Sequence, residues 1–233
     1  MYENRARNTG RQIDLRVIVL PARGRQVAPD PVVWLTGGPG LAAAEDPAGI
    51  AKLFSALRTR HDIVLVDQRG TGRSSPLACS LYDTGPLQAY MDPMFPVDRV
   101  SACRRELERR ADLTQYTTDN ATDDLADVLT SLGYARADLI GGSYGTQAAL
   151  VFLRRHPDRV HRMVLDGVVP PNVALFSATP RAIARELGVI DSAHVVDSAM
   201  RRLPVTVTLW NWGRLRRETV TVTRRAFAER MFS

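Results

Sequence analysis

Short apolar runs and amphipathic stretches follow one another along the first 171 residues, and this alternation predicts strands and helices in turn. The predicted strands are Ile13–Leu20, Val32–Leu35, His61–Asp67, the run from Asp138 to Gly142, and Val160–Asp166. The predicted helices are Pro47–Leu57, Val97–Arg110, a helix that begins near Thr117 and runs through Leu132, and Thr146–Arg155. This order predicts an α/β fold, with a mostly parallel sheet covered by helices on both faces.

The pattern also predicts how far each strand is buried. Ile13–Leu20 alternates between apolar and polar residues, so we expect one of its faces to be exposed. Val32–Leu35 is a short apolar run, typical of a strand that is buried on both faces. His61–Asp67 and Val160–Asp166 are also predicted to be buried strands.

The pattern changes after Pro171. Residues 178–203 are helical and mixed in character, and two alternating segments, Val205–Leu209 and Glu218–Thr223, predict a β-hairpin. Another helix is expected from Arg224. We therefore divide the chain into a core of residues 1–171 and a smaller region of residues 172–233.

Composition removes several classes of protein. The 45% hydrophobic and 24% charged residues are ordinary for a soluble globular chain, and no run is long and apolar enough for a membrane span or a signal peptide. The net charge is +6, but the arginines are dispersed among acidic residues and aromatics make up only 6%. We therefore expect no nucleic-acid or membrane partner, and nothing in the sequence directs the chain out of the cytosol.

Cys79 and Cys103 are the two cysteines of the chain, and they leave two interpretations open. They are either two buried thiols or one disulfide, which would require an oxidising compartment. Together with the scattered histidines they make no recognisable metal site, so we expect no metal.

The stretch Gly141–Gly145 fits the G-x-S-x-G nucleophile elbow, in which a strand turns sharply into a helix and presents a serine. The elbow raises the hydroxyl of Ser143 above the sheet and places it at a helix N-terminus. The Tyr144 backbone N–H can then point at an oxyanion. We therefore predict that Ser143 is a catalytic nucleophile.

Three glycine-bearing loops, Gly37–Gly40, Gln68–Ser75 and the elbow, follow predicted inner strands. The carboxyl ends of parallel strands face one crevice, where ligands bind. An acyl transfer needs a second N–H donor from the loop after a neighbouring strand, and we predict that Gly38 supplies it beside Tyr144.

Four segments in this order resemble a known family: Leu35–Gly40, Asp67–Ser74, Gly141–Thr146 and Leu165–Pro171. The chain is similar to α/β-hydrolase serine exopeptidases of the proline iminopeptidase and tripeptidyl aminopeptidase type. The second branch fits better, because Cys79 and Cys103 resemble a cysteine pair in the same segment of its members, which are typically exported. Residues from Arg202 to Thr208 resemble part of the cap domain of that branch.

The resemblance implies an α/β-hydrolase fold and hydrolysis of a peptide or amide bond near a free N-terminus, without a cofactor. The expected partner is therefore a peptide or a small amide or ester substrate. Asp67 and Arg69 are interpreted as residues that fix the loops beneath the site.

The sequence departs from the family in one respect. The family's catalytic acid and histidine follow the cap, in the order Ser, Asp, His, whereas this sequence ends at Ser233 in the cap-like region. We therefore expect a fold that is incomplete at its C-terminus, with a partial cap, an unpaired sheet edge and doubtful activity. His61, His156 and His161 are expected at the wrong end of the sheet, and His194 in the cap-like region. Asp166 is better placed to orient a histidine, although holding its turn is the simpler role.

Two further interpretations remain open. The chain is either a catalytically inactive module that binds peptides or pairs with a complementing C-terminal chain, or a hydrolase that cleaves an ester, a lactone or an epoxide.

Overall fold

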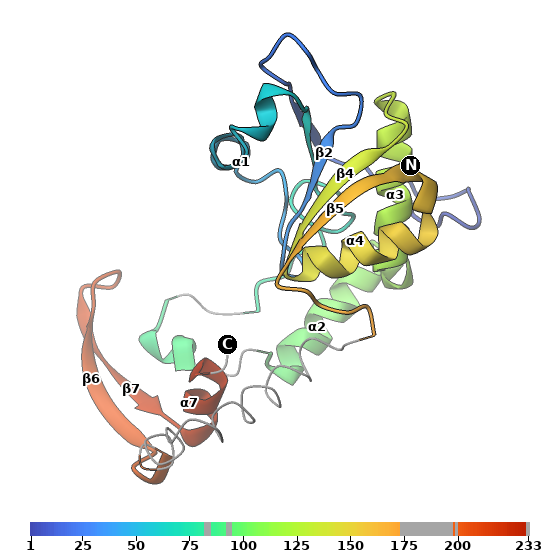
Figure 1. The fold of residues 1–233 in the computed structure, drawn as a ribbon. Coiled ribbons are helices and arrows are strands. Elements are labelled where there is room, and N and C mark those ends of the chain that lie inside the picture. The colour runs from blue at the N-terminus through green and yellow to red at the C-terminus, as the bar shows by residue number, and fades with distance from the viewer. Residues whose placement is uncertain (82–84, 92–94, 173–197, 199, 232–233) are drawn as a thin grey trace. The chain divides into compact units, whose positions relative to one another are not determined.

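The computed structural model describes residues 1–81, 85–91, 95–172, 198 and 200–231. The chain forms two compact units, the first made of Met1–Ala78 with Arg110–Val173 and the second of Cys79–Arg109 with Ala174–Ser233 (Figure 1). The first unit omits Cys79–Arg109, a segment that the hydrophobic pattern does not set apart. The division into residues 1–171 and 172–233 stays a prediction.

The first unit contains a five-stranded sheet in the order β1-β3-β2-β4-β5. β1 is antiparallel to β3, and the other neighbouring pairs are parallel, so the predicted mostly parallel sheet is confirmed. Its strands are β1 Val17–Leu20, β2 Val32–Leu35, β3 Ile63–Val66, β4 Ala137–Gly142 and β5 Val160–Asp166.

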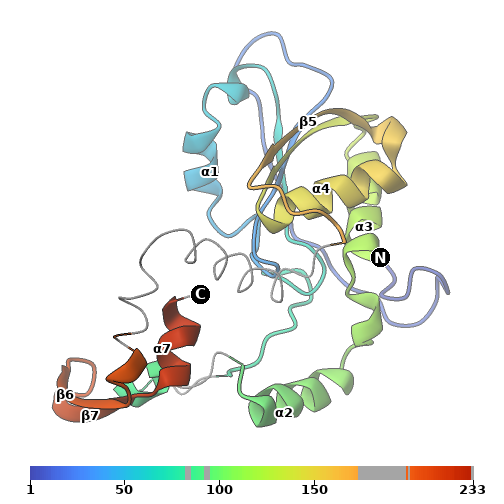
Figure 2. The same cartoon turned by 60° about the horizontal axis from the view of Figure 1, so that its bottom comes forward.

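Helices cover both faces of this sheet, as the pattern predicts. Figure 2 shows α1 (Pro47–Leu53) on one side of the strands, with α3 (Thr118–Ser131) and α4 (Tyr144–Arg155) on the other. On the α1 side, the ring of Phe54 meets Trp34 of β2 edge to face at 5.6 Å. On the other side, Phe152 of α4 is fully buried, so the core has two apolar layers.

The helix ends follow from their local sequence. Pro47 occupies the first turn of α1, where the Asp46 carboxylate accepts a hydrogen bond from Gly49 N–H at 2.9 Å. The Thr117 hydroxyl accepts from Asn120 N–H at 3.2 Å and starts α3. Gly133, with φ of 81°, follows the end of that helix.

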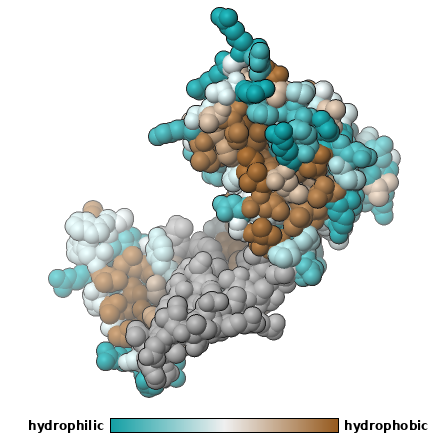
Figure 3. Space-filling model, in the orientation of Figure 1, coloured by the Kyte–Doolittle hydropathy of each residue, from teal (hydrophilic) through white to brown (hydrophobic). Residues whose placement is uncertain are grey.

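β5 differs from the buried strand that its apolar run predicts. Every second residue of its later half is exposed, and Val164 keeps 58% of its surface accessible. The reason is that alternate residues of a strand share one face of the sheet, and the described residues leave that face of β5 uncovered. β5 is also an edge strand, since it pairs with β4 and with no other described strand. Figure 3 shows hydrophobic side chains gathered over this part of the unit.

The second unit contains α2 (Val97–Glu108), a hairpin of β6 (Val205–Asn211) and β7 (Arg216–Val222), and α7 (Arg224–Met231). The predicted hairpin and the two helices therefore form. Most of the helical stretch predicted at 178–203 lies outside the described residues. Cys79 and Cys103 form a disulfide, which selects one of the two interpretations of the cysteines. Among the described helices, none combines the length and the apolar character needed to cross a bilayer.

A network of charged residues ties the first residues of the chain to α3 in the first unit. The buried guanidinium of Arg69 donates to both carboxylate oxygens of Asp124 at 2.7 Å and to the carbonyl of Glu3 at 2.8 Å. Asp124 also accepts from Arg5 at 2.7 Å. The Glu3 carboxylate in turn accepts from the hydroxyl of Tyr116 at 2.9 Å. We call these five residues the N-terminal charge network.

This network predicts alkaline sensitivity. Burial, and then the hydrogen bond to Glu3, raise the pKa of Tyr116 to about 12, whereas an unfolded tyrosine titrates near ~10. The contribution of Tyr116 is therefore fully present below pH ~10 and is lost as pH rises towards ~12. In urea unfolding between pH 9 and 12, the wild type should lose more stability than Tyr116→Phe. Tyr134, whose pKa is also raised to about 12, is present in both proteins and cancels in the comparison. Parallel pH profiles would contradict this assignment.

Candidate active site

Ser143 lies between the end of β4 and the start of α4, and its side chain is exposed. Its backbone has φ of 52° and ψ of −121°, a conformation that residues with a side chain rarely adopt. A strand that turns into a helix through such a residue presents the serine hydroxyl above the sheet. This is the geometry that the G-x-S-x-G pattern predicts.

Two glycines allow the turn because strand and helix pass at van der Waals distance. A Cβ atom on Gly141 would lie 2.6 Å from the carbonyl oxygen of Gly145. A Cβ atom on Gly145 would collide with the carbonyl of Leu35 on β2. A side chain at either position would therefore collide with the backbone packed against it, which is why both positions are glycine.

Hydrogen bonds hold the backbone of Ser143 on both sides. Its N–H donates to the carbonyl oxygen of Asp166 on β5 at 2.8 Å. Its carbonyl oxygen accepts from the Thr146 backbone N–H at 2.9 Å and from the Thr146 hydroxyl at 2.6 Å. The strained conformation is thus supported by β5 and by the first turn of α4.

The Gly37–Gly40 loop lies against the serine. A Cβ atom on Gly37 would be 3.4 Å from Ser143 Cβ and 3.8 Å from Ser143 Oγ. Gly38 has φ of 110° and precedes a cis bond to Pro39. Tyr144, the first residue of α4, contributes one of the N–H groups that have no carbonyl partner within the helix. The structure therefore brings the loop of Gly38, Tyr144 and Ser143 together, while their catalytic roles stay a prediction.

Asp67 fixes the loops beneath this site, as the sequence predicts. The fully buried Asp67 carboxylate accepts from Ala44 N–H at 2.8 Å and from Arg73 N–H at 3.1 Å, so it joins the segment after Gly40 to the loop after β3. Arg69 acts in the N-terminal charge network instead. Close by, the hydroxyl of Tyr144 makes a 2.9 Å hydrogen bond with Thr118, and burial raises its pKa.

The described histidines make their hydrogen bonds with groups other than Ser143: His61 with a backbone carbonyl, and His156 and His161 with carboxylates. Their predicted place at the wrong end of the sheet holds for His61 and His161, which lie where β3 and β5 begin. Each histidine has its own partner: His61 Nδ1 lies 2.9 Å from Asp30 O, His156 Nε2 lies 2.9 Å from Asp123 Oδ1, and His161 Nδ1 lies 2.8 Å from Asp138 Oδ1. His194 lies outside the described residues. Among those residues, Ser143 therefore has no histidine partner.

Asp166 contacts the elbow through its backbone. Its carbonyl accepts from Ser143, whereas its exposed carboxylate makes no hydrogen bond to the described residues. The simpler role expected for this side chain, to hold the turn after β5, is therefore not what the contacts give. The Thr146 hydroxyl donates to the Ser143 carbonyl and accepts from Val169 N–H in that turn. The sequence does not predict that Thr146 makes these two hydrogen bonds, because no local pattern distinguishes this threonine from others in the chain.

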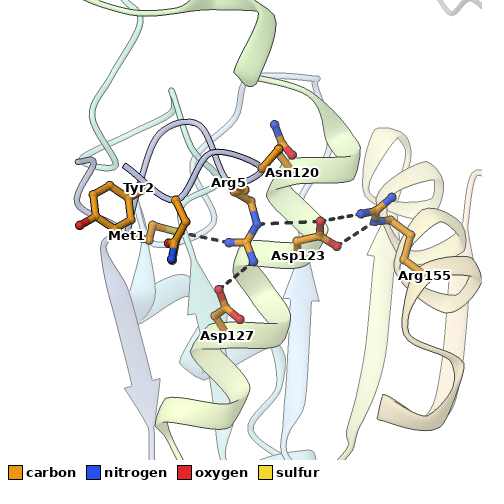
Figure 4. Close-up of a pocket in the computed structure, with 9 residues that line it drawn as sticks. Met1, Tyr2, Arg5, Asn120, Asp123, Asp127 and Arg155 are labelled. Atoms are coloured by element: carbon orange, nitrogen blue, oxygen red, sulfur yellow. Dashed lines mark hydrogen bonds and ion pairs between the residues drawn. The ribbon is translucent and has the colours of Figure 1, made fainter. Parts of the chain in front are cut away.

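A cavity of about 490 Å³ opens elsewhere in the first unit (Figure 4). It is lined by residues of the N-terminal segment, α3 and the end of α4, and Arg5, Asp123, Asp127 and Arg155 surround it. These charges neutralise one another, because Arg5 donates to Asp127 at 2.8 Å and Arg155 to Asp123 at 2.6 Å. None of its lining residues belongs to the elbow, so we assign it no part in the candidate active site.

Known proteins are similar to this chain in sequence. The family described as the alpha/beta hydrolase fold matches residues 30–220. A tripeptidyl aminopeptidase of Streptomyces lividans is 29% identical over 181 residues, which cover 72% of this chain and 34% of that protein. A proline iminopeptidase of Neisseria gonorrhoeae is 30% identical over 138 residues, which cover 59% of this chain and 32% of that protein.

The match extends over part of these relatives. The chain spans about a third of the length of the curated relatives that it matches. A solved alpha/beta hydrolase enzyme from a Medee basin deep-sea metagenome library aligns with 74% of this chain and 48% of its own, at 18% identity and a TM-score of 0.47. Because the family match covers most of the sequence, the chain belongs to the alpha/beta hydrolase fold family.

Proposed function

We propose that this chain is a serine hydrolase that acts through an acyl-enzyme on Ser143. The observation that carries the proposal is the exposed Ser143 held at φ of 52° between β4 and α4. A strained backbone at an exposed serine is a feature of functional sites, where the cost of the conformation is offset by surrounding contacts.

In the proposed reaction, the Ser143 hydroxyl attacks a carbonyl carbon and loses its proton, and the carbonyl oxygen becomes an oxyanion. The backbone N–H groups of Gly38 and Tyr144 stabilise that charge. The tetrahedral intermediate then breaks its bond to the amine or alcohol, which leaves with the proton that Ser143 lost. Water later attacks the acyl-enzyme, releases the acyl group as an acid and restores the serine hydroxyl. The closeness of Gly37 to Ser143 Oγ supports this assignment, because it brings the loop of Gly38 beside the reacting oxygen.

The reaction also requires a general base. A serine hydroxyl near neutral pH is a poor nucleophile until a neighbouring group accepts its proton. His61, His156 and His161 bind Asp30, Asp123 and Asp138 instead. The proposal therefore assigns the base, and the acid that orients it, to residues outside the described part of the chain or to a second polypeptide.

For the substrate, we propose a peptide bond near a free N-terminus. The support is that several relatives carry peptidase names, among them tripeptidyl aminopeptidase, proline iminopeptidase and the serine protease Hip1 of Mycobacterium tuberculosis. Esters are the alternative, because acyl-enzyme chemistry serves both bonds. Hydrolysis of aminoacyl amides would support the peptidase assignment, and hydrolysis of p-nitrophenyl esters alone would replace it.

A fluorophosphonate probe tests the nucleophile directly. We expect it to label the wild type and to leave Ser143→Ala unlabelled, because the phosphorus atom bonds to the activated serine oxygen. Ser55→Ala, which removes another exposed hydroxyl of the same unit, should label like the wild type. Equal labelling of wild type and Ser143→Ala would refute the proposal.

A second candidate is supported by the second edge of β5, which pairs with no strand among the described residues. Unpaired strand edges that carry apolar side chains pair readily with other chains, and Val164 is 58% exposed there. In this alternative the chain pairs with a complementing C-terminal polypeptide through β5. A monodisperse monomer in light scattering, with Val164→Lys behaving like the wild type, would argue against it.

A further inference from the structure

Thr146 lies three residues after Ser143 in the first turn of α4, and its side chain is fully buried. Its hydroxyl oxygen is 2.6 Å from Ser143 O and 2.8 Å from Val169 N. A backbone N–H only donates, so the hydroxyl accepts from Val169 and its single proton goes to Ser143. The chemistry of the two partners therefore fixes the direction of both hydrogen bonds.

The two bonds join the nucleophile to the loop after β5. Val169 belongs to the stretch 167–172, which follows Asp166, and Asp166 itself accepts from the Ser143 N–H. The side chain of Gln147 makes a second contact with this loop, at 3.2 Å to the carbonyl of Pro171. Of the two α4 side chains, Thr146 is the one that also holds the backbone of Ser143.

A strained residue keeps its conformation only when its surroundings determine it. Without the hydroxyl, the Ser143 carbonyl keeps the Thr146 N–H as its one partner among the described residues, and Val169 N–H loses the acceptor that the structure gives it. The direction in which the Ser143 side chain points depends on the orientation of the peptide group that contains the Ser143 carbonyl. Small errors in the position of a reacting atom lower reaction rates steeply.

We propose that Thr146 is a positioning residue for the Ser143 nucleophile, and that its hydroxyl couples the Ser143 backbone to the loop at residues 167–172. The inference rests on the proposed function, because it assigns Ser143 the role of nucleophile. It adds that the reactivity of this serine depends on how the loop is held.

The test compares three variants by their rate of fluorophosphonate labelling. Thr146→Val removes the hydroxyl, and we expect labelling to slow by about 10- to 100-fold. Thr146→Ser restores both hydrogen bonds and should label close to the wild-type rate. Thr122→Val is the matched control, since Thr122 is a buried threonine of α3 whose hydroxyl donates to Asp119 O at 2.8 Å, and it should label normally.

A second readout does not depend on catalysis. In hydrogen exchange followed by mass spectrometry, the amide of Val169 should exchange about tenfold faster in Thr146→Val and remain protected in Thr146→Ser. If the wild type is not labelled at all, the proposed function fails, and the exchange experiment still tests the coupling. The inference would be overturned if Thr146→Val were labelled at the wild-type rate and its Val169 amide exchanged at the wild-type rate. Equal loss of labelling in Thr146→Val and Thr122→Val would also overturn it, because the effect would then be one of general stability.

Discussion

Asp124→Asn should destabilise the first unit by about 3–5 kcal/mol, because it leaves the buried Arg69 guanidinium without its counter-charge. The side chains of Arg69 and Asp124 are 1% and 2% exposed, and two hydrogen bonds of 2.7 Å join them. Asparagine keeps the shape of aspartate but carries no charge, and its amide nitrogen only donates, so the change removes both the counter-charge and one acceptor of Arg69. Thermal unfolding should show a fall in the melting temperature of roughly 10 °C.

Asp127→Asn is the matched control for this prediction. Asp127 lies on the same helix and binds Arg5 at 2.8 Å, but 55% of its side chain is exposed. Exposed ion pairs contribute about 1 kcal/mol or less, so this variant should unfold close to the wild type. If both variants lost the same stability, burial of the Arg69–Asp124 pair would not be the cause.

Gly145→Ala should cost about 3 kcal/mol or more and abolish labelling of Ser143. The new methyl group would meet the carbonyl of Leu35 and lie 2.9 Å from the carbonyl oxygen of Thr36, so α4 would have to move away from β2. Because Ser143 stands at the junction of these elements, the same movement displaces its hydroxyl. Urea unfolding measures the first effect, and the fluorophosphonate probe measures the second.

Gly133→Ala separates this collision from the ordinary cost of replacing a glycine. Gly133 has φ of 81°, but a Cβ atom there meets nothing within 4 Å. Its substitution should therefore cost about 1 kcal/mol from backbone strain alone and leave labelling unchanged. Equal losses at Gly133 and Gly145 would mean that the contact with β2 does not constrain the elbow.

The sequence predicts the centre of the fold well because local signals and long-range packing agree there. β4 and α4 are predicted by an apolar run that ends in Gly141–Gly145. The glycines in that stretch indicate a close backbone approach, even though the sequence does not show that β2 is the neighbouring strand. The caps at Asp46 and Thr117 are equally local, since the side chain bonds to a backbone group three residues away.

The rest depends on partners far apart in sequence, which periodicity does not report. The pattern of β5 predicts a buried strand, yet burial depends on what covers each face of the sheet, and the described residues leave one face of β5 exposed. The same is true of Arg69, whose partner Asp124 is 55 residues away. In the candidate site, the glycine pattern predicts the position of the serine. The contact between Thr146 and Val169 depends instead on the fold of a loop 23 residues later, which no local pattern predicts.

The Cys79–Cys103 disulfide also determines how the chain behaves when its backbone is cut. The two cysteines are 24 residues apart, so they enclose a covalent ring within the second unit. A single protease cut inside that ring leaves both halves of the polypeptide attached to each other, and they come apart only after a thiol reductant is added. Electrophoresis without a reductant therefore does not separate the two halves, whereas the water added at the cut bond raises the mass of the molecule.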